Sequence, residues 1–335
     1  MTFKIAVVGA TGNVGREMLN IIYERGFPIS EVVALASERS IGIKLPFGDK
    51  KIEVQDVQSY DFSSTNICLM SAGHAFSKQM SPKIASTGCI VIDNSSAWRY
   101  DSDVPLIVPE VNPEMISLAS RKNIIANPNC STIQLVVVLK PLHDLAIIKR
   151  VVVSTYQSVS GAGRKGINEL FTQTEAVLAQ KEIKNHVFTK NIAFNIIPHI
   201  DVFMDDGSTK EEWKVLVETQ KILDKNIKVN CTAARVPVFI GHSESVNIEL
   251  EKNISVESAI NAINKSPGCI IIDKSGKNEY TTPIECIDTD IVFVSRIRKD
   301  HTVKNGLNLW IVANNLRKGA ALNAVQIAEL LIQKD

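Results

Sequence analysis

The sequence lacks the features that mark several broad classes of protein. It contains no stretch of about 20 apolar residues, the length that a membrane-spanning helix needs, and no long run of basic residues. With a formal net charge of only +1, an extended contact with nucleic acid is not expected. The first residues lead directly into an apolar run, without the charged leader of a secretion signal. We therefore expect a cytoplasmic protein without membrane contacts.

Cysteine is sparse and widely spaced. The six cysteines never form a CxxC pair, so neither disulfides nor a zinc site are expected in a chain without a secretion signal. Most of them stand in apolar runs such as GCIVID and GCIIID, where a cysteine is usually a small buried hydrophobic residue. Cys130 is the exception, because polar residues surround it.

The chain is long enough for about two compact domains, since it has 335 residues and 45% of them are hydrophobic. Over residues 1–128, short β-branched runs alternate with helical patterns, which indicates α/β structure with a Rossmann-type parallel sheet. Over residues 129–315 the predicted strands are longer, and this pattern favours an α+β domain with a mixed sheet. We expect the closing helix, residues 316–335, to complete the first domain.

A glycine-rich loop, GATGNVG, follows the first predicted strand and precedes a helix. Backbone N–H groups at the positive end of a helix can hold a dinucleotide pyrophosphate, and glycine removes the Cβ that would block its approach. The spacing is GxxGxxG rather than the usual GxGxxG, so a tight turn without a ligand stays an alternative. The predicted cofactor contacts in this loop are Gly9, Thr11, Gly12, Asn13 and Val14.

The segment after the second predicted strand indicates which dinucleotide binds. Sheets specific for NAD usually offer an acidic residue to the ribose there. Ser37, Arg39 and Ser40 instead offer a guanidinium and two hydroxyls, which suit a 2′-phosphate. This favours NADP, although Glu38 is also present and a solvated loop arginine is the alternative interpretation.

Cys130 follows Asn-Pro-Asn and precedes the buried helix predicted by the run IQLVVVLKPL. A helix dipole at this position favours a thiolate, although a capped and inert cysteine is the alternative. A nucleophilic cysteine needs a proton-transfer partner with a pKa near working pH, usually a histidine. His242 follows an apolar strand and a glycine, so it can project into a cleft. The other histidines are more typical of structural positions: His74, His143, His186, His199 and His301.

Eight segments resemble those of the aspartate-semialdehyde dehydrogenase family, in the same order and over essentially the whole chain. The resemblance implies an NADP-dependent enzyme of lysine, threonine, methionine and diaminopimelate biosynthesis. It would reductively dephosphorylate L-aspartyl 4-phosphate through a cysteine thioester, as a homodimer with the sheet of the second domain at the interface. The segments are GATGNVG, ASERSIG, SSAWRY, NPNCSTIQ, YQSVSGAG, EEWK, RVPVFIGHS and WIVANNLRKGAALNAVQ.

The resemblance also implies roles for single residues. Cys130 is the implied nucleophile, His242 the general acid/base, and Gln157 the residue that orients the intermediate. Backbone N–H groups at the helix start near Cys130 are expected to stabilise the oxyanion. The implied ligands are Arg235 for the substrate carboxylate, Glu211 or Glu212 for its ammonium, Lys214 and Arg99 for phosphate, Asn129 for phosphate or the oxyanion, Ser160 and Gly161 beside the nicotinamide, and Asn315 as a further cofactor contact; no metal is implied.

Two alternatives remain open at this point. N-acetyl-gamma-glutamyl-phosphate reductase has the same general plan, but its substrate has no free ammonium for the candidate carboxylate at Glu211. A non-catalytic protein that senses NADP has no need for a nucleophile, a base and a carboxylate clamp together.

The first prediction concerns the reactivity of Cys130. We expect iodoacetamide to alkylate Cys130 with a pH profile whose midpoint lies below the value of about 8.5 for an ordinary thiol. The rate of inactivation, measured from pH 5 to 10, checks this. An unshifted midpoint would contradict the argument from the helix dipole and the histidine.

Overall fold

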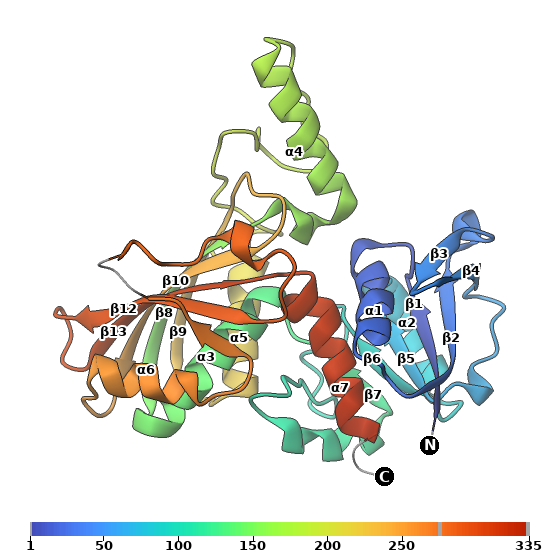
Figure 1. The fold of residues 1–335 in the computed structure, drawn as a ribbon, viewed down its shortest axis with the longest axis horizontal. Coiled ribbons are helices and arrows are strands. Elements are labelled where there is room, and N and C mark those ends of the chain that lie inside the picture. The colour runs from blue at the N-terminus through green and yellow to red at the C-terminus, as the bar shows by residue number, and fades with distance from the viewer. Residues whose placement is uncertain (1, 274–276, 333–335) are drawn as a thin grey trace. The chain divides into compact units, whose positions relative to one another are not determined.

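The computed structural model describes residues 2–273 and 277–332. The chain divides into two compact units (Figure 1): unit 1 comprises Met1–Pro128 and Ala320–Asp335, and unit 2 comprises Asn129–Gly319. Residue 1 of the predicted first domain and residues 333–335 of the predicted closing helix lie outside the described part of the chain. Within the described part, no helix is long and apolar enough to cross a membrane.

Unit 1 contains a seven-stranded sheet in the order β3-β4-β2-β1-β5-β6-β7. The β3–β4 pair at one edge is antiparallel, and the other neighbouring pairs are parallel. The predicted Rossmann-type sheet is therefore confirmed. The strands are β1 (Phe3–Val8), β2 (Ile29–Ala36), β3 (Lys44–Phe47), β4 (Lys50–Asp56), β5 (Ile67–Met70), β6 (Ile90–Asp93) and β7 (Ile124–Ala126).

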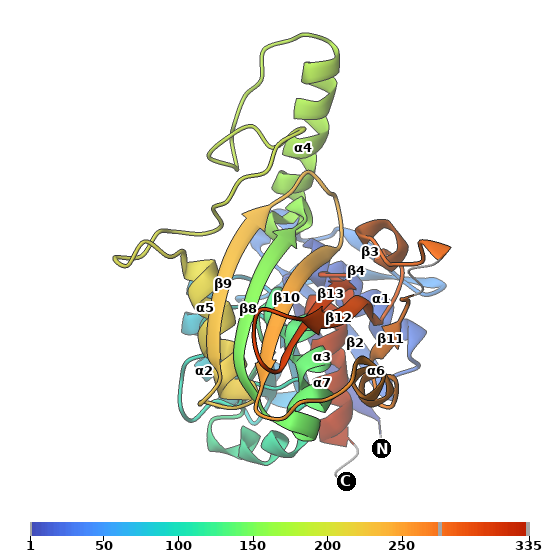
Figure 2. The same cartoon turned by 90° about the vertical axis from the view of Figure 1, so that its left-hand side faces the viewer.

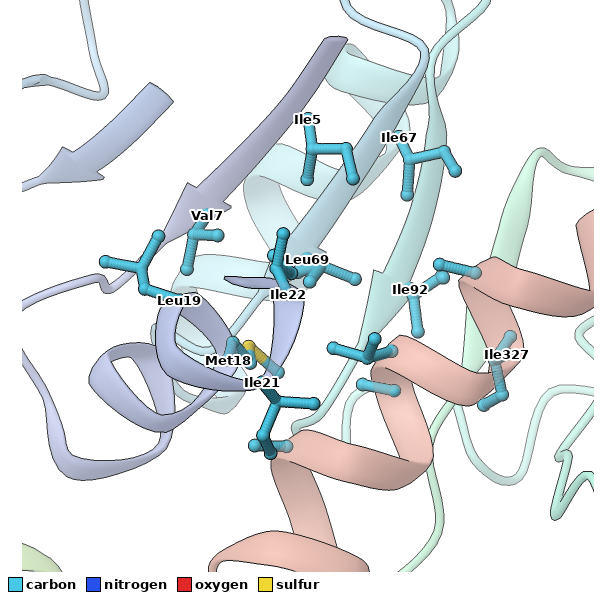
Figure 3. Close-up of a cluster of buried hydrophobic side chains, with 14 of the residues drawn as sticks. Ile5, Val7, Met18, Leu19, Ile21, Ile22, Ile67, Leu69, Ile92 and Ile327 are labelled. Carbon is cyan, nitrogen blue, oxygen red and sulfur yellow. The ribbon is translucent and has the colours of Figure 1, made fainter. Parts of the chain in front are cut away.

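Helices of unit 1 bury an apolar face against this sheet. Ile5 and Val7 alternate with residues of the opposite face of β1, and they meet Ile22 from α1 and Ile327 from α7 in one core cluster (Figure 3). The last helix of the chain is thus part of the same core as the first strand. The helical segments are α1 (Asn13–Glu24), η1 (Glu38–Ser40), η2 (Phe62–Ser64), α2 (His74–Ala85), η3 (Pro113–Arg121) and α7 (Leu322–Ile332).

The closing helix begins later than residue 316, where the sequence indicated its start. The side-chain oxygen of Asn314 accepts hydrogen bonds from the N–H groups of Leu316 and Arg317, at 2.8 and 3.1 Å. Such a side chain competes with the helix for backbone donors and forms a turn instead. A π-helical segment, Arg317–Ala321, follows this turn, and α7 starts after it.

Unit 2 contains a six-stranded sheet in the order β11-β12-β13-β10-β8-β9. The pairs β8–β9 and β11–β12 are parallel and the other three are antiparallel, so the predicted mixed sheet is confirmed. The elements are α3 (Cys130–Ala146), β8 (Ile148–Gln157), η4 (Val159–Ala162), α4 (Gly163–Leu178), α5 (Lys210–Ile222), β9 (Lys228–Arg235), β10 (His242–Leu250), α6 (Val256–Asn264), β11 (Cys269–Ile271), η6 (Pro283–Cys286), β12 (Val292–Asp300) and β13 (Gly306–Ala313).

Helix α3 is the central helix of unit 2. It contacts β8, β10, β12 and β13 as well as α5 and α6. Because it packs against elements on several sides, it is apolar around almost its whole circumference. Figure 2 shows β9, β8 and β10 side by side, with α5 next to β9 and α4 extending away from the strand ends. The first residue of α3 is Cys130, and its charge acts on Arg235, the last residue of β9, so the candidate nucleophile lies near that strand end.

The second prediction concerns the core of unit 1. Replacing Ile327, which is fully buried, by Ala should lower the free energy of unfolding by about 2–5 kcal/mol, because the change leaves a cavity between α7 and the sheet. Urea denaturation followed by circular dichroism measures it. The matched control is Ile284→Ala, because Ile284 is 75% exposed; equal effects of the two changes would contradict the predicted role of α7.

Candidate active site

Asn129 fixes the position of Cys130 at the start of α3. The side-chain oxygen of Asn129 accepts hydrogen bonds from the N–H groups of Ser131 and Thr132, at 2.9 and 3.4 Å. Its own backbone N–H donates to Oε2 of the buried Glu218 at 2.6 Å. Cys130 is therefore the first helical residue, and it is half-buried. The cap occupies the N–H groups of Ser131 and Thr132, and the expected role of N–H groups near Cys130 in binding an oxyanion stays a prediction.

The structure gives Glu211 and Glu212, between which the sequence did not choose, different hydrogen-bond partners. Glu212 belongs to a capping box: its Oε2 accepts from the N–H of Thr209 at 2.6 Å, and its Oε1 accepts from the N–H of Ala233 at 2.9 Å. Glu211 is buried and accepts a hydrogen bond from the side-chain amide of Asn129 instead. Glu212 therefore holds the helix in place, and Glu211 is the carboxylate next to Asn129.

Glu211 is the centre of a buried polar network. Its Oε1 accepts hydrogen bonds from the side-chain amides of Asn129 and Gln157, at 2.9 and 3.1 Å. Its Oε2 accepts from Lys214 at 3.0 Å, and Lys214 also pairs with Asp201 at 2.6 Å. Burial alone would raise the pKa of Glu211, but the charge of Lys214 and these hydrogen bonds lower it to about 2. Glu211 is therefore a carboxylate at any physiological pH.

Gln157 and Arg235 end two neighbouring parallel strands, where they are paired in register. Nη1 of Arg235 donates to the carbonyl oxygen of Ser158 at 2.7 Å. Arg235 is buried, which lowers its pKa, whereas the negative charges of Glu211 and Cys130 raise it. This coupling indicates that the guanidinium lies close to both the candidate nucleophile and the candidate ammonium ligand.

His242 begins β10 beside the first turn of α3. The side-chain amide of Gln134, four residues after Cys130, donates to the carbonyl oxygen of His242 at 3.4 Å. Nδ1 of the ring accepts from the N–H of Ser158 at 3.1 Å, whereas Nε2 has no hydrogen-bond partner in the described part of the chain. Burial and the charge of Arg235 lower the pKa of His242 to about 3. The expectation of a pKa near working pH is therefore wrong, because the sequence did not reveal this burial.

Gly161 leaves a space between Arg235 and His242. A Cβ added at this glycine would lie 2.8 Å from Nη1 of Arg235 and 3.4 Å from Nε2 of His242. A side chain at position 161 would thus occupy the volume that both groups face. Ser160, expected beside the nicotinamide, and Asn315, expected as a further cofactor contact, are hydrogen-bonded to each other at 2.9 Å. The structure thus brings Asn129, Cys130, Gln157, Ser160, Gly161, Glu211, Lys214, Arg235, His242 and Asn315 together in unit 2.

Sequence reasoning missed several residues of this cluster. Glu218 follows Glu211 and Lys214 at helical spacing, so an amphipathic reading of α5 would have found it. Ser158 and Asp201 lie in loops, where no periodic pattern marks them. Their roles depend on partners far away in the sequence.

The glycine-rich loop of unit 1 has the geometry that a pyrophosphate needs. Gly9 has a φ of +80°, and a Cβ there would lie 2.4 Å from the carbonyl oxygen of Ser71. Gly12 caps α1 and has no side chain to satisfy the first N–H groups of the helix. The buried Nδ2 of Asn13 has no partner in the described part of the chain. The loop follows β1, which lies between β2 and β5. The strand order reverses at this point of the sheet, and parallel sheets usually bind dinucleotides there.

The remaining predicted residues of unit 1 are found at two places. Ser37, Arg39 and Ser40 form an exposed or half-exposed turn directly after β2. Leu35, near the end of β2, accepts hydrogen bonds from the N–H groups of Gly9 and Ala10, so this turn follows the strand that borders the glycine-rich loop. Arg99 is buried, and its Nη2 donates to the carbonyl oxygen of Asn94 at 3.0 Å. The predicted roles of these residues at phosphate groups stay predictions.

Comparisons with known proteins identify the family. Residues 4–119 match the family model "Semialdehyde dehydrogenase, NAD binding domain", and residues 139–318 match "Semialdehyde dehydrogenase, dimerisation domain". An aspartate-semialdehyde dehydrogenase of Aquifex aeolicus is 56% identical over 337 residues, which cover 100% of this chain and 99% of the relative. The chain belongs to the aspartate-semialdehyde dehydrogenase family.

Solved structures of aspartate-semialdehyde dehydrogenases have the same fold. Aspartate semialdehyde dehydrogenase II of Vibrio cholerae, complexed with ASA, has a TM-score of 0.97 and 48% identity over 99% of each chain. The Candida albicans aspartate semialdehyde dehydrogenase with NADP has a TM-score of 0.77 and 25% identity, covering 99% of this chain and 98% of that chain.

The third prediction concerns the charge of Glu211. A carboxylate whose pKa falls from 4.5 to about 2 on folding contributes about 3 kcal/mol to the free energy of unfolding above pH 4.5 and loses it as the pH falls toward 2. Glu211→Gln should therefore be less stable than the parent protein at pH 7, and the difference should shrink toward pH 2.

Urea denaturation at a series of pH values measures this difference. The matched control is Glu182→Gln at an exposed position, which should change the free energy of unfolding by less than about 0.5 kcal/mol. A constant difference between Glu211→Gln and the parent protein across the pH range would show that the carboxylate is not held in its ionised form by folding.

Proposed function

We propose that the protein is an aspartate-semialdehyde dehydrogenase that reduces L-aspartyl 4-phosphate to L-aspartate 4-semialdehyde with NADPH, in the biosynthesis of lysine, threonine, methionine and diaminopimelate. The observation that carries the proposal is the cluster in unit 2, where a cysteine at a helix start shares one buried site with an ionised carboxylate and an arginine. The relatives that match over the whole chain support the same activity.

The charges of the site suit a free amino acid. A substrate with an α-carboxylate and an α-ammonium needs one positive and one negative partner, and Arg235 and Glu211 supply them in a buried setting where charge pairs are strong. Glu211 already accepts three hydrogen bonds, so its orientation is fixed before substrate arrives. An N-acetylated substrate has no ammonium for this carboxylate, which disfavours the N-acetyl-gamma-glutamyl-phosphate reductase alternative.

Cys130 performs the covalent chemistry. Its thiolate attacks the acyl carbon of aspartyl phosphate, the C–O bond to phosphate breaks, and a thioester remains on the sulfur. NADPH, when bound, supplies the hydride that reduces this thioester. The resulting thiohemiacetal oxyanion re-forms its C=O bond and expels the Cys130 thiolate, so the aldehyde leaves. Gln157, whose side chain is fixed by Glu211 and Thr155, orients the acyl group during these steps.

The cofactor is assigned to the glycine-rich loop of unit 1. The N–H of Asn13 at the start of α1 would hold the pyrophosphate, together with the side chain of Asn13. Ser37, Arg39 and Ser40 would bind the 2′-phosphate of NADP. The remaining predicted contacts are Gly9, Thr11 and Val14 in the loop, and Ser160, Gly161 and Asn315 in unit 2.

The other partners follow from the same assignment. Lys214 and Arg99 would bind the phosphate that leaves the substrate and that the reverse reaction requires. A homodimer formed through unit 2 is supported by the match of residues 139–318 to a dimerisation domain. A cytoplasmic location is part of the proposal.

The fourth prediction tests the substrate. In the reverse direction the protein should reduce NADP with L-aspartate 4-semialdehyde and phosphate at least 100-fold faster, in kcat/KM, than with N-acetylglutamate semialdehyde. The second substrate lacks the ammonium that would bind Glu211, and the loss of this charged hydrogen bond accounts for about that factor. Absorbance of NADPH at 340 nm measures the rate. A preference for N-acetylglutamate semialdehyde would overturn the assignment.

Cys130→Ser is the control that separates an enzyme from a sensor of NADP. The variant should bind NADP with unchanged affinity, measured by calorimetry, and should show no turnover. Unchanged turnover would exclude the proposed thioester mechanism.

A further inference from the structure

A turn of π-helix lies directly against the candidate nucleophile. The segment Arg317–Ala321 is π-helical, and the N–H of Gly319 donates to the carbonyl oxygen of Asn314, five residues earlier, at 3.1 Å. Turns of this kind are rare and are frequent at functional sites. Gly319 is buried and meets Cys130, the first residue of α3.

The contact is so close that position 319 has no room for a side chain. A Cβ added there would lie 3.0 Å from Cβ of Cys130, 3.4 Å from its Cα and 3.5 Å from its carbonyl oxygen. Carbon atoms that are not bonded to each other pack at about 3.5–4.0 Å. An alanine at position 319 would therefore have to push Cys130 and the turn apart.

The same contact gives the direction of the Cys130 side chain. Sγ is farther from the added Cβ position than Cβ, Cα and the carbonyl oxygen of the cysteine are, so the sulfur points away from the turn. A cysteine side chain has three staggered rotamers. The rotamer that turns Sγ toward Gly319 would drive the sulfur into the backbone of the turn, so the contact excludes it.

Cys130 is held from behind on α3. The side chain of Asn129 caps the helix by accepting from the N–H of Ser131 at 2.9 Å, and the N–H of Asn129 donates to Glu218 at 2.6 Å. The helix itself packs against four strands and two helices. The start of α3 therefore cannot move away from Gly319 without breaking buried hydrogen bonds.

The π-helical turn is anchored on its own side. The side-chain amide of Asn314 donates to the carbonyl oxygen of Ile287, and its Oδ1 accepts from the N–H of Arg317 at 3.1 Å. Nε of Arg317 pairs with Oδ1 of Asp290 at 2.6 Å. Both partners of the contact are thus fixed before substrate arrives, which makes Gly319 a rigid wall behind the cysteine.

We propose that Gly319 is a positioning residue for the nucleophile: its bare Cα lets the π-helical turn pack against Cβ of Cys130, and this contact holds Sγ in the orientation from which it attacks the acyl carbon. The inference rests on the proposed function for the attack, and on the packing within unit 2 for the contact. A reacting atom displaced by about 1 Å loses about 100-fold in rate, so a contact of this kind has a measurable effect.

Gly319→Ala tests the positioning role. The variant should lower kcat about 10- to 100-fold and change KM for aspartate semialdehyde less than about threefold, because the sulfur is displaced while Arg235 and Glu211 still hold the substrate. The reverse reaction with NADP and phosphate measures both constants. A parent-like kcat would overturn the inference.

Gly306→Ala is the matched control for crowding. Gly306 begins β13 and pairs with Glu249, seven residues along β10 from His242. A Cβ at position 306 would lie 2.5 Å from Cγ2 of Val303, so this change also crowds unit 2 but does so away from the cysteine. The control should keep kcat within about threefold of the parent value, and a loss equal to that of Gly319→Ala would contradict the positioning role.

A double-mutant cycle on the midpoint of thermal unfolding, Tm, tests the contact without any substrate. Gly319→Ala should lower the Tm of the parent protein, and it should lower the Tm of the Cys130→Gly variant by less than half as much, because that variant has no Cβ for the added methyl group to meet. Equal losses in the two backgrounds would overturn the inference. If Gly319→Ala does not fold alone, a folded double variant supports the contact and an unfolded one contradicts it.

The cycle also separates this inference from the proposed function. A coupling between positions 130 and 319, found together with a parent protein that does not act on aspartate semialdehyde, would refute the proposed function and leave the contact established. Activity without coupling would refute the role of Gly319 and leave the proposed function in place.

Discussion

The site in unit 2 depends on the side chain of Asn129. One carboxamide caps the helix that begins with Cys130 and at the same time donates to Glu211, and the backbone N–H of the same residue is held by Glu218. The candidate nucleophile and the candidate ammonium ligand are therefore joined through a single residue. Their separation is set by short hydrogen bonds to buried groups, which costs little entropy when substrate arrives.

Because the site is buried, each charge in it shifts the pKa values of the neighbouring groups. Glu211 stays ionised because Lys214 and two amides compensate for its desolvation, and Lys214 is in turn held by Asp201. A buried polar network is stable when each of its charges and hydrogen-bonding groups has a partner, and it is destabilising when some of them have none. The same arginine that would bind a carboxylate also prevents a second cation from forming on His242. The proposed recognition of a substrate carboxylate and the lowered pKa of His242 therefore both depend on the charge of Arg235.

Local sequence patterns predicted the parts of the molecule whose causes are local. The glycine spacing predicted the loop after β1, and the Asn-Pro-Asn segment followed by an apolar run predicted that Cys130 starts a helix. The sequence could not show that Glu211 and Glu212 have different partners. Glu212 accepts a hydrogen bond from the N–H of Ala233, which lies on a strand that the sequence does not place beside α5. The low pKa of His242 was missed for the same reason, since burial arises from residues distant in the chain.

The position of α7 has a consequence for the order of folding. Ile327 belongs to the same core as Ile5, although all of unit 2 lies between them in the sequence. On the ribosome, the nascent chain exposes the strands of unit 1 first. The apolar face of these strands stays uncovered until α7 has been synthesised. Unit 2 is continuous in sequence, so all its strands are available before that point. During translation the catalytic unit can therefore mature before the nucleotide-binding one, and a truncated transcript would yield a first unit without its final packing partner.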